Sequence, residues 1–156
     1  MQNKVRDSII LVTGGAGFIG SYVIEELIPL QPKRIIIIDN LIRGSRANMK
    51  SFTNNPLIEF HEGDIRDLGL LEKCIAGADY VFHMAALRIN ACAANPREGF
   101  DVMLKSTFEV ADLCAKHKVK KVIYSSSASV YGLAQHFPTP ETDNPYNNQQ
   151  FYGAAK

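Results

Sequence analysis

Apolar residues along the chain gather in short continuous runs. The runs are residues 8–12, 34–39, 57–61, 80–83 and 122–125. Apolar, β-branched runs without alternation are typical of strands covered on both faces, as in a parallel sheet. The segments between them mix apolar and polar positions at helical spacing and predict helices. These predicted helices are residues 18–30, 67–76 and 96–117.

Strands and helices therefore alternate, which predicts right-handed crossovers and an α/β fold with a doubly wound parallel sheet of the Rossmann type. The expected strand order is 3-2-1-4-5, with a ligand crevice between strands 1 and 4. A complete sheet of this kind has at least one more strand, so we expect a fold truncated after about five strands. Residues 132–150 are rich in Pro, Asn, Thr and Gln and are predicted to form a loop.

Three glycines, Gly14, Gly17 and Gly20, lie between the first predicted strand and the first predicted helix. In the dinucleotide-binding fingerprint, the first glycine permits a tight turn, the second admits a pyrophosphate and the third lets the helix pack on the strand. The helix N-terminus then offers unpaired N–H groups to the phosphates. No Gly-Lys-Ser/Thr sequence follows, which excludes a P-loop. The alternative interpretation is a tight strand–helix turn without a ligand.

Asp39 ends the second predicted strand, 25 residues after Gly14. At about this spacing a carboxylate accepts hydrogen bonds from the adenosine ribose hydroxyls. Such a carboxylate repels a 2′-phosphate and favours NAD over NADP, although Arg43 nearby would soften the preference. Alternatively, Asp39 only caps the strand end. Asp64 follows the third predicted strand and would either hold an adenine amino group or shape a simple turn.

Tyr152 and Lys156 are four residues apart, so their side chains would share one face of a helix. A neighbouring ammonium group favours the ionised form of a phenol, which suits the pair to general base catalysis. Lys156 can also hold the nicotinamide ribose hydroxyls. Ser127, at the end of the last predicted strand, can donate a hydrogen bond to an oxygen that gains charge during hydride transfer. The alternative is a surface helix pair.

Composition narrows the class of protein further. The chain has 46% hydrophobic and 21% charged residues with a net charge of +1, which is typical of a globular domain. No basic stripe favours nucleic acid, and no apolar run is long enough to span a membrane or act as a signal segment. The three cysteines are widely spaced and predict neither a metal site nor disulfides. We therefore expect a cytoplasmic protein without a bound metal.

Six motifs occur in a recognisable order along nearly the whole chain. They are TGGAGFIG at 13–20, DNL at 39–41 followed by GSRAN at 44–48, GDIRD at 63–67, HMAA at 83–86, YSSSASVYG at 124–132 and FYGAAK at 151–156. In combination they resemble the extended short-chain dehydrogenase/reductase family, specifically its nucleotide-sugar epimerases and dehydratases.

The resemblance implies NAD as the cofactor and a UDP-sugar or other nucleotide-sugar as the substrate, with an activity like that of UDP-galactose 4-epimerase. It implies catalytic roles for Ser127, Tyr152 and Lys156. Asp64 and Ile65 would contact adenine, and Ala85 and Ala86 would line the cofactor path. The full set of implied cofactor-binding residues is Gly14, Gly17, Phe18, Ile19, Gly20, Asp39, Asn40, Asp64, Ile65, Ala85, Ala86, Tyr152 and Lys156.

The sequence departs from the family pattern in two respects. Met103 and Ser106 stand where the family usually has Asn and Gly, and that Asn ordinarily supports the hydrogen-bond network of the active site. Family members are also about twice as long. We therefore expect residues 1–156 to be the NAD-binding Rossmann domain, with the C-terminal sugar-binding domain absent. The predicted helix at 96–117 resembles one of the two helices that build the family's dimer, so a homo-oligomer is possible.

Three functions are compatible with these features. The chain is a piece of an active epimerase or dehydratase, a short protein that binds NAD without turnover, or an interaction module that pairs through a sheet edge and a helix. We expect residues 1–156 alone to lack epimerase activity.

Overall fold

The computed structural model describes residues 4–145 and 147–156, and this part of the chain divides into two compact units. The sheet unit consists of residues 4–85 and 108–124. The helical unit consists of residues 86–107 and 125–156 apart from 146. The prediction that residues 1–156 form one NAD-binding domain stays a prediction.

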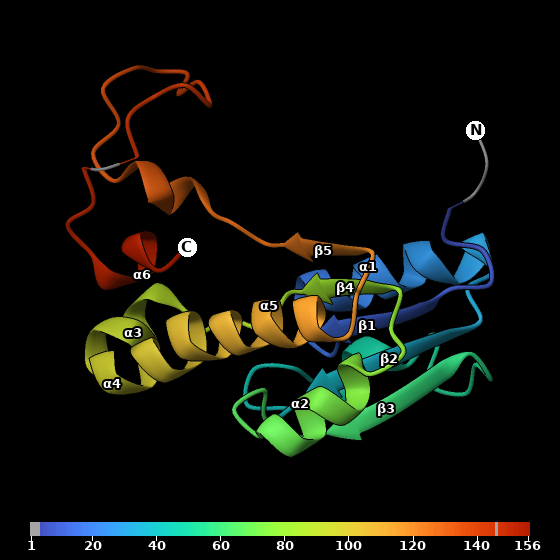
Figure 1. Ribbon diagram of the computed structural model, residues 1–156. Coiled ribbons are helices and arrows are strands. Elements are labelled where there is room, and N and C mark those ends of the chain that lie inside the picture. The colour runs from blue at the N-terminus through green and yellow to red at the C-terminus, as the bar shows by residue number, and fades with distance from the viewer. Residues whose placement is uncertain (1–3, 146) are drawn as a thin grey trace. The chain divides into compact units, whose positions relative to one another are not determined.

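The sheet unit is built on parallel strands (Figure 1). In the described chain the strands are β1 (Ile9–Thr13), β2 (Arg34–Asp39), β3 (Ile58–Glu62), β4 (Tyr80–His83) and β5 (Lys121–Tyr124). Their order is β3-β2-β1-β4-β5, which confirms the predicted order and the α/β class. The bounds of β2 and β4 agree with the prediction, whereas the other three are displaced by one residue.

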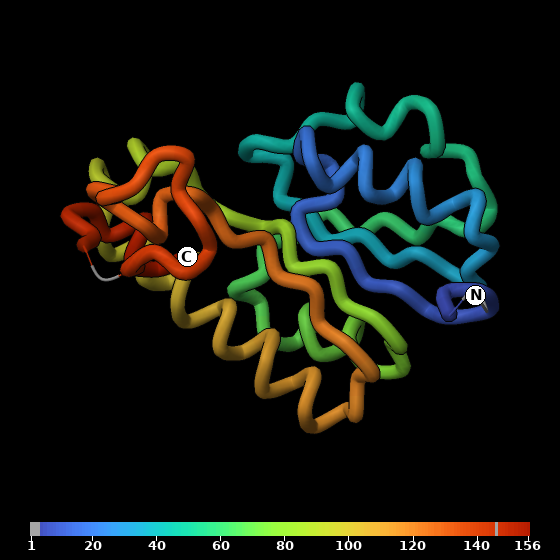
Figure 2. The backbone as a smooth tube through the Cα atoms, turned by 90° about the horizontal axis from the view of Figure 1, so that it is seen from above, coloured from blue at the N-terminus to red at the C-terminus, as the bar shows by residue number. Residues whose placement is uncertain are grey.

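Helices cover both faces of this sheet, as the view along its edge shows (Figure 2). Helix α1 (Phe18–Leu27) lies on one face, and α2 (Leu68–Ile75) lies on the other with the part of α5 (Ser106–Lys116) that belongs to the sheet unit. The helix predicted over residues 18–30 is α-helical as far as Leu27, and its last three residues form the 3₁₀ turn η1 (Ile28–Leu30). Pro29 accounts for the change, because proline cannot donate to the α-helical ladder.

The core beneath α1 combines two strands and one helix. In the parallel register Ile10 pairs with Ile35 and Val12 with Ile37, so these four side chains share the α1 face of the sheet. Ile24 of α1 packs against them, and all five are fully buried. Each such side chain contributes about 1.5–3 kcal/mol by leaving water, so this layer fixes α1 firmly over β1 and β2.

Both units also contain short helices and turns. In the sheet unit this is the 3₁₀ turn η2 (Arg46–Met49). The helical unit contains α3 (Ile89–Ala94), α4 (Pro96–Gly99), η3 (Phe100–Lys105), the first residues of α5, η4 (Ala128–Tyr131) and α6 (Phe151–Ala154).

The single helix predicted over residues 96–117 is interrupted. Its middle part, η3, is a π-helix, in which the backbone N–H of Ser106 bonds to the carbonyl of Asp101 five residues earlier. The Ser106 hydroxyl donates to the same carbonyl, and the Thr107 hydroxyl donates to the Met103 carbonyl at 2.8 Å. These side-chain donors stabilise the wider turn, and such π segments are frequent near functional sites.

Other predicted features are readily located. Residues 132–145 and 147–150 contain no helix or strand, as expected for a loop. Within the described ranges, no helix combines the length and apolar character needed to cross a membrane, and no group of three or more His, Cys, Asp or Glu residues could hold a metal ion. The three cysteines are buried free thiols.

Candidate cofactor and catalytic site

The turn between β1 and α1 is closed by glycines that approach backbone directly. Gly14 has φ +70°, and a Cβ at this position would lie 2.7 Å from the backbone nitrogen of Ala85, which follows β4. A Cβ on Gly20 would overlap the carbonyl oxygen of Gly14. The first and third glycines therefore have the roles predicted for them, a tight turn and close helix–strand packing.

The N-terminus of α1, at the middle glycine, carries no side-chain cap. Gly17 is the N-cap, no side chain caps the helix, and no acidic residue lies in its first turn. A Cβ on Gly17 would meet only the carbonyl oxygen of Gly14, at 3.1 Å. First-turn N–H groups have no partner within their own helix and carry the positive end of its dipole, so this cradle fits an anionic diphosphate.

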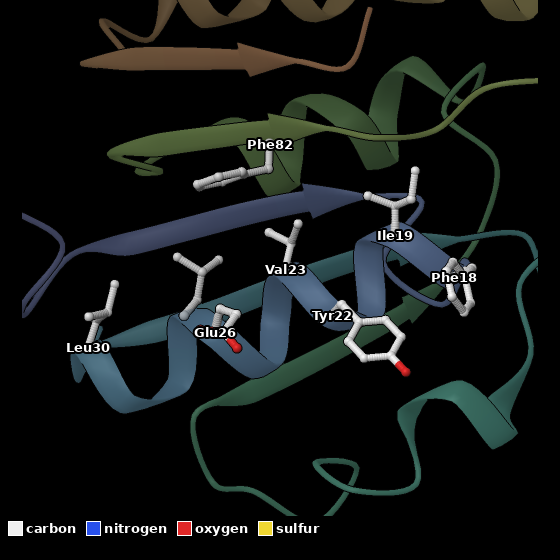
Figure 3. A pocket seen from close by; sticks show the side chains of 8 residues that line it. Phe18, Ile19, Tyr22, Val23, Glu26, Leu30 and Phe82 are labelled. Atoms are coloured by element: carbon white, nitrogen blue, oxygen red, sulfur yellow. The ribbon is translucent and has the colours of Figure 1, made fainter. Parts of the chain in front are cut away.

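Phe18 and Ile19 place their side chains away from the sheet core. They are 74% and 61% exposed and line an apolar hollow of about 430 Å³ that α1 shares with Phe82 of β4 (Figure 3). The lining residues are Phe18, Ile19, Tyr22, Val23, Glu26, Leu27, Leu30 and Phe82. This hollow offers one carboxylate and no cationic donor, so it does not suit a diphosphate. At the glycine turn, Phe18 and Ile19 offer a cofactor their backbone N–H groups, because both lie in the first turn of α1.

Asp39 connects the end of β2 to the glycine turn. Its Oδ2 accepts the Ala16 backbone N–H at 3.0 Å and its Oδ1 accepts the Leu41 N–H at 2.8 Å. The residue is 7% exposed. The alternative predicted from sequence, a strand-end cap, is thus present in the structure. Each carboxylate oxygen has two lone pairs, so both keep an acceptor position for a ribose hydroxyl.

Asp64, just beyond β3, is held by two neighbouring side chains. Arg66 donates to both of its carboxylate oxygens, at 2.9 and 2.8 Å, and Asn40, just beyond β2, donates at 2.9 Å. These contacts, led by that of Arg66, lower the pKa of Asp64 to about 2. The ionised carboxylate therefore stabilises the folded state above pH 3.8, and this contribution is lost as the pH falls toward 2.

Three further predicted contact residues, Ile65, Ala85 and Ala86, have different surroundings. Ile65 is 6% exposed and belongs to the core of the sheet unit. The Ala85 backbone N–H donates to Thr13 Oγ1 at 3.3 Å, and the same hydroxyl bonds to the buried ring of His83 at 2.7 Å. These hydrogen bonds join the carboxyl ends of β1 and β4. The strand order changes direction between these two strands, which is where the ligand crevice is predicted. Ala86 belongs to the helical unit, where it packs near buried Cys92.

The predicted catalytic residues lie in the helical unit. Ser127 is half-buried, and its hydroxyl accepts the Ser129 backbone N–H at 3.1 Å at the start of η4. Tyr152 lies in α6 and packs against a buried cluster that includes Cys92, Met103 and Ala155. Gly153 fits beside Ser129, because a Cβ there would overlap the Ser129 carbonyl oxygen. The serine-rich segment and α6 are therefore packed against one another.

Lys156 lies two residues beyond α6, which spans Phe151–Ala154. The expectation that Tyr152 and Lys156 share one helical face stays a prediction. The Lys156 ammonium group donates to the Ser125 carbonyl at 2.5 Å. Burial lowers the pKa of Lys156.

Met103 occupies a structural position in the helical unit. It is 2% exposed, and its sulfur accepts the Leu87 backbone N–H at 3.2 Å. A thioether is a weak acceptor and donates nothing, so Met103 cannot reproduce the hydrogen bonds of an amide. The GDIRD motif contains Arg66, but the sequence did not show that the Arg66 side chain pairs with Asp64.

Known proteins are similar to nearly the whole of this chain. Residues 10–156 match the sequence model of the NAD dependent epimerase/dehydratase family. A putative UDP-glucose 4-epimerase of Methanocaldococcus jannaschii is 36% identical over 95% of this chain and 47% of its own length. UDP-glucose 4-epimerase of Neisseria meningitidis serogroup C is 35% identical over 94% of this chain and 44% of its own length. The chain thus spans about half the length of these relatives.

Solved structures show the same relationship. The UDP-N-acetylglucosamine 4-epimerase of Methanobrevibacter ruminantium is 34% identical, with a TM-score of 0.88 over 96% of this chain and 47% of its own. The UDP-glucose 4-epimerase of Bifidobacterium longum in complex with NAD+ and UDP is 35% identical, with a TM-score of 0.86 over 96% of this chain and 46% of its own. The predicted Rossmann fold and the family's dependence on NAD are confirmed. This chain belongs to the NAD-dependent epimerase/dehydratase family.

Proposed function

We propose that residues 1–156 form the NAD-binding part of a nucleotide-sugar epimerase or dehydratase that acts by transient hydride transfer. The glycine turn carries this proposal, because Gly17 places no side chain at the N-terminus of α1 and no other side chain caps it. Asp39 lies beside that turn with an acceptor position left on each oxygen. The Bifidobacterium longum relative, solved with NAD+ and UDP, supports the choice of NAD and of a UDP-sugar substrate.

Each predicted catalytic residue has a distinct role in the proposal. NAD supplies a hydride acceptor when bound. Tyr152 takes the proton of the sugar hydroxyl as general base, and Ser127 donates a hydrogen bond to the same oxygen. The Lys156 ammonium group favours the ionised tyrosine and holds ribose hydroxyls. The keto group formed on the sugar is then reduced on its other face, or the sugar loses water.

Asp39 is the residue that we expect to discriminate NAD from NADP. Asp39→Asn removes the charge that repels a 2′-phosphate and keeps one oxygen acceptor, so the preference for NAD should fall by about tenfold. Asp39→Ala should weaken NAD binding itself and also destabilise the turn, since the Ala16 and Leu41 N–H groups lose their partner. Calorimetric titration of both dinucleotides measures the ratio. An unchanged ratio in Asp39→Asn would refute the ribose assignment.

Residues 1–156 alone are expected to bind NAD without interconverting nucleotide sugars. The chain spans 44–47% of the relatives' length, which leaves about half of the family's polypeptide to contribute to substrate binding. The assay is incubation of the purified chain with NAD and UDP-galactose, followed by chromatography for UDP-glucose. We expect no product above the rate of a protein-free control. Product formation would show that these residues suffice for catalysis.

A non-catalytic interaction module is the second candidate function. Phe100 and Leu104, four residues apart in η3 of the helical unit, are 52% and 38% exposed. Large exposed apolar side chains at such spacing favour pairing with another helix. Sedimentation at several concentrations tests for a homo-oligomer. Self-association together with absence of NAD binding would favour this function over the first.

A further inference from the structure

Segment 44–48, which leads from β2 into the turn η2, is fixed by contacts within the sheet unit. The Ser45 side chain accepts the Ala47 backbone N–H at 3.1 Å and thereby caps η2. Met49, the last residue of η2, is 2% exposed and packs in the core beneath α1. A buried apolar side chain resists displacement, because it would have to return to water. The segment is therefore held in place from both ends of η2.

This segment directs two N–H donors at the carbonyl oxygen of Ala16 in the glycine turn. The Ser45 backbone N–H donates at 2.9 Å, and the Asn48 side-chain amide donates at 2.8 Å. A carbonyl oxygen has two lone pairs, so both acceptor positions of this oxygen are filled by the segment.

Ala16 is held at its N–H group as well. That N–H donates to Asp39 Oδ2 at 3.0 Å. Gly44 lets segment 44–48 approach both residues, because a Cβ at this position would lie 2.5 Å from Asp39 Oδ1 and 2.8 Å from the Ala16 Cβ. Ala16 therefore links the segment to the carboxylate that is proposed to bind ribose.

The contacts of Ala16 decide which way its peptide bond to Gly17 faces. In a trans peptide the carbonyl oxygen and the N–H point to opposite sides. Here the oxygen points at segment 44–48, while the Gly17 N–H lies inside the turn and donates to the Gly14 carbonyl at 3.1 Å. Glycine tolerates a positive φ, so steric exclusion alone does not stop this peptide from turning over. A peptide turned over would place a partially negative oxygen inside the turn, against the diphosphate.

We propose that Asn48 is a positioning residue for the cofactor: with the Ser45 N–H, it holds the Ala16 carbonyl on the outer side of the glycine turn, so that only N–H groups face the diphosphate. This inference rests on the proposed function, that is, on a dinucleotide whose diphosphate lies at the N-terminus of α1. Asn48 acts through Ala16 and not by contact with the dinucleotide. Its contribution is therefore confined to ligands that carry phosphate.

The test is the substitution Asn48→Leu, which removes the amide donor at nearly constant size. Calorimetric titration should show NAD binding about fivefold weaker than in the wild type, as expected for the loss of one hydrogen bond. Adenosine carries no phosphate, so an NMR titration should give it the same dissociation constant in both proteins. The variant should fold, because Asn48 is exposed and the buried Met49 is retained.

Asn54→Leu is the matched control, since Asn54 is an exposed asparagine of the sheet unit that lies outside segment 44–48. Its affinity for NAD should equal that of the wild type. The carbonyl ¹³C resonance of Ala16 in the unliganded proteins checks the cause, because a hydrogen bond to a carbonyl oxygen deshields its carbon. This resonance should move upfield in Asn48→Leu and stay in place in Asn54→Leu.

The outcomes separate this role of Asn48 from the proposed function. Wild-type protein that does not bind NAD would overturn the proposed function and the inference with it. Wild-type binding of NAD that is unchanged in Asn48→Leu would overturn the inference alone. Equal losses of affinity for NAD and adenosine would point to a general distortion of the fold and contradict the positioning role. An Ala16 carbonyl resonance that does not move in Asn48→Leu would contradict the contact on which the role depends.

Discussion

Gly17→Ala is expected to lower NAD affinity by about 10- to 100-fold while the protein stays folded. The added methyl group would lie at the N-terminus of α1, where the diphosphate is proposed to bind. Crowding of this kind costs about 1–3 kcal/mol, which corresponds to that loss of affinity. The protein should still fold, because the one close contact of the new Cβ, with the Gly14 carbonyl oxygen at 3.1 Å, is relieved by a shift of a few tenths of an ångström. Replacing an N-cap glycine in this way costs less than about 1 kcal/mol.

Gly69→Ala is the matched control for Gly17→Ala. Gly69 lies inside α2, where the nearest atom to a new Cβ is Asp67 Oδ1 at an ordinary 3.4 Å. We expect a slight gain in stability of about 0.5–1 kcal/mol and no change in the dissociation constant for NAD. Calorimetric titration and urea unfolding of both variants provide the two measurements. Equal NAD affinity in Gly17→Ala and the wild type would place the diphosphate elsewhere.

Gly14→Ala is expected to destabilise the protein by about 3 kcal/mol or more. A left-handed backbone costs a residue with a Cβ about 1–2 kcal/mol, and the new Cβ would also lie 2.7 Å from the Ala85 nitrogen. That backbone cannot move aside easily, because Ala85 is tied to Thr13 at the end of β1. A loss of this size is a large share of the 5–15 kcal/mol that folds a typical domain.

Gly77→Ala separates the two causes of the Gly14→Ala effect. Gly77 also has a positive φ, +85°, but a Cβ there would meet no atom within 4 Å. This variant should lose only the conformational part, about 1–2 kcal/mol. Urea unfolding gives both values from the shift of the midpoint at a constant slope. Equal losses of unfolding free energy in the two variants would show that the contact with Ala85 does not contribute to the destabilisation.

The sheet could be predicted from sequence because its strands are buried on both faces. Residues 35–39 of β2 are all buried, so the run of isoleucines that marked the strand is itself the core of the sheet. The glycine spacing likewise identified the turn, since Gly14 and Gly20 are each required by a backbone contact that only the absence of a Cβ permits. Patterns dictated by burial or by steric exclusion are local and can be recognised in one sequence.

Features that depend on tertiary contacts could not be predicted. The spacing of residues 96–117 indicates a helix but does not reveal the π segment, which depends on which carbonyls Ser106 and Thr107 bond. The network around Asp64 was missed for the same reason, because Asn40 is 24 residues away in sequence.

A crystal structure of residues 1–156 soaked with NAD tests the central claim most directly. We expect the diphosphate above Gly17, within hydrogen-bond distance of the first N–H groups of α1, and the adenosine ribose against Asp39. A dinucleotide bound away from the β1–α1 turn, or a turn that stays empty at saturating NAD, would contradict the account.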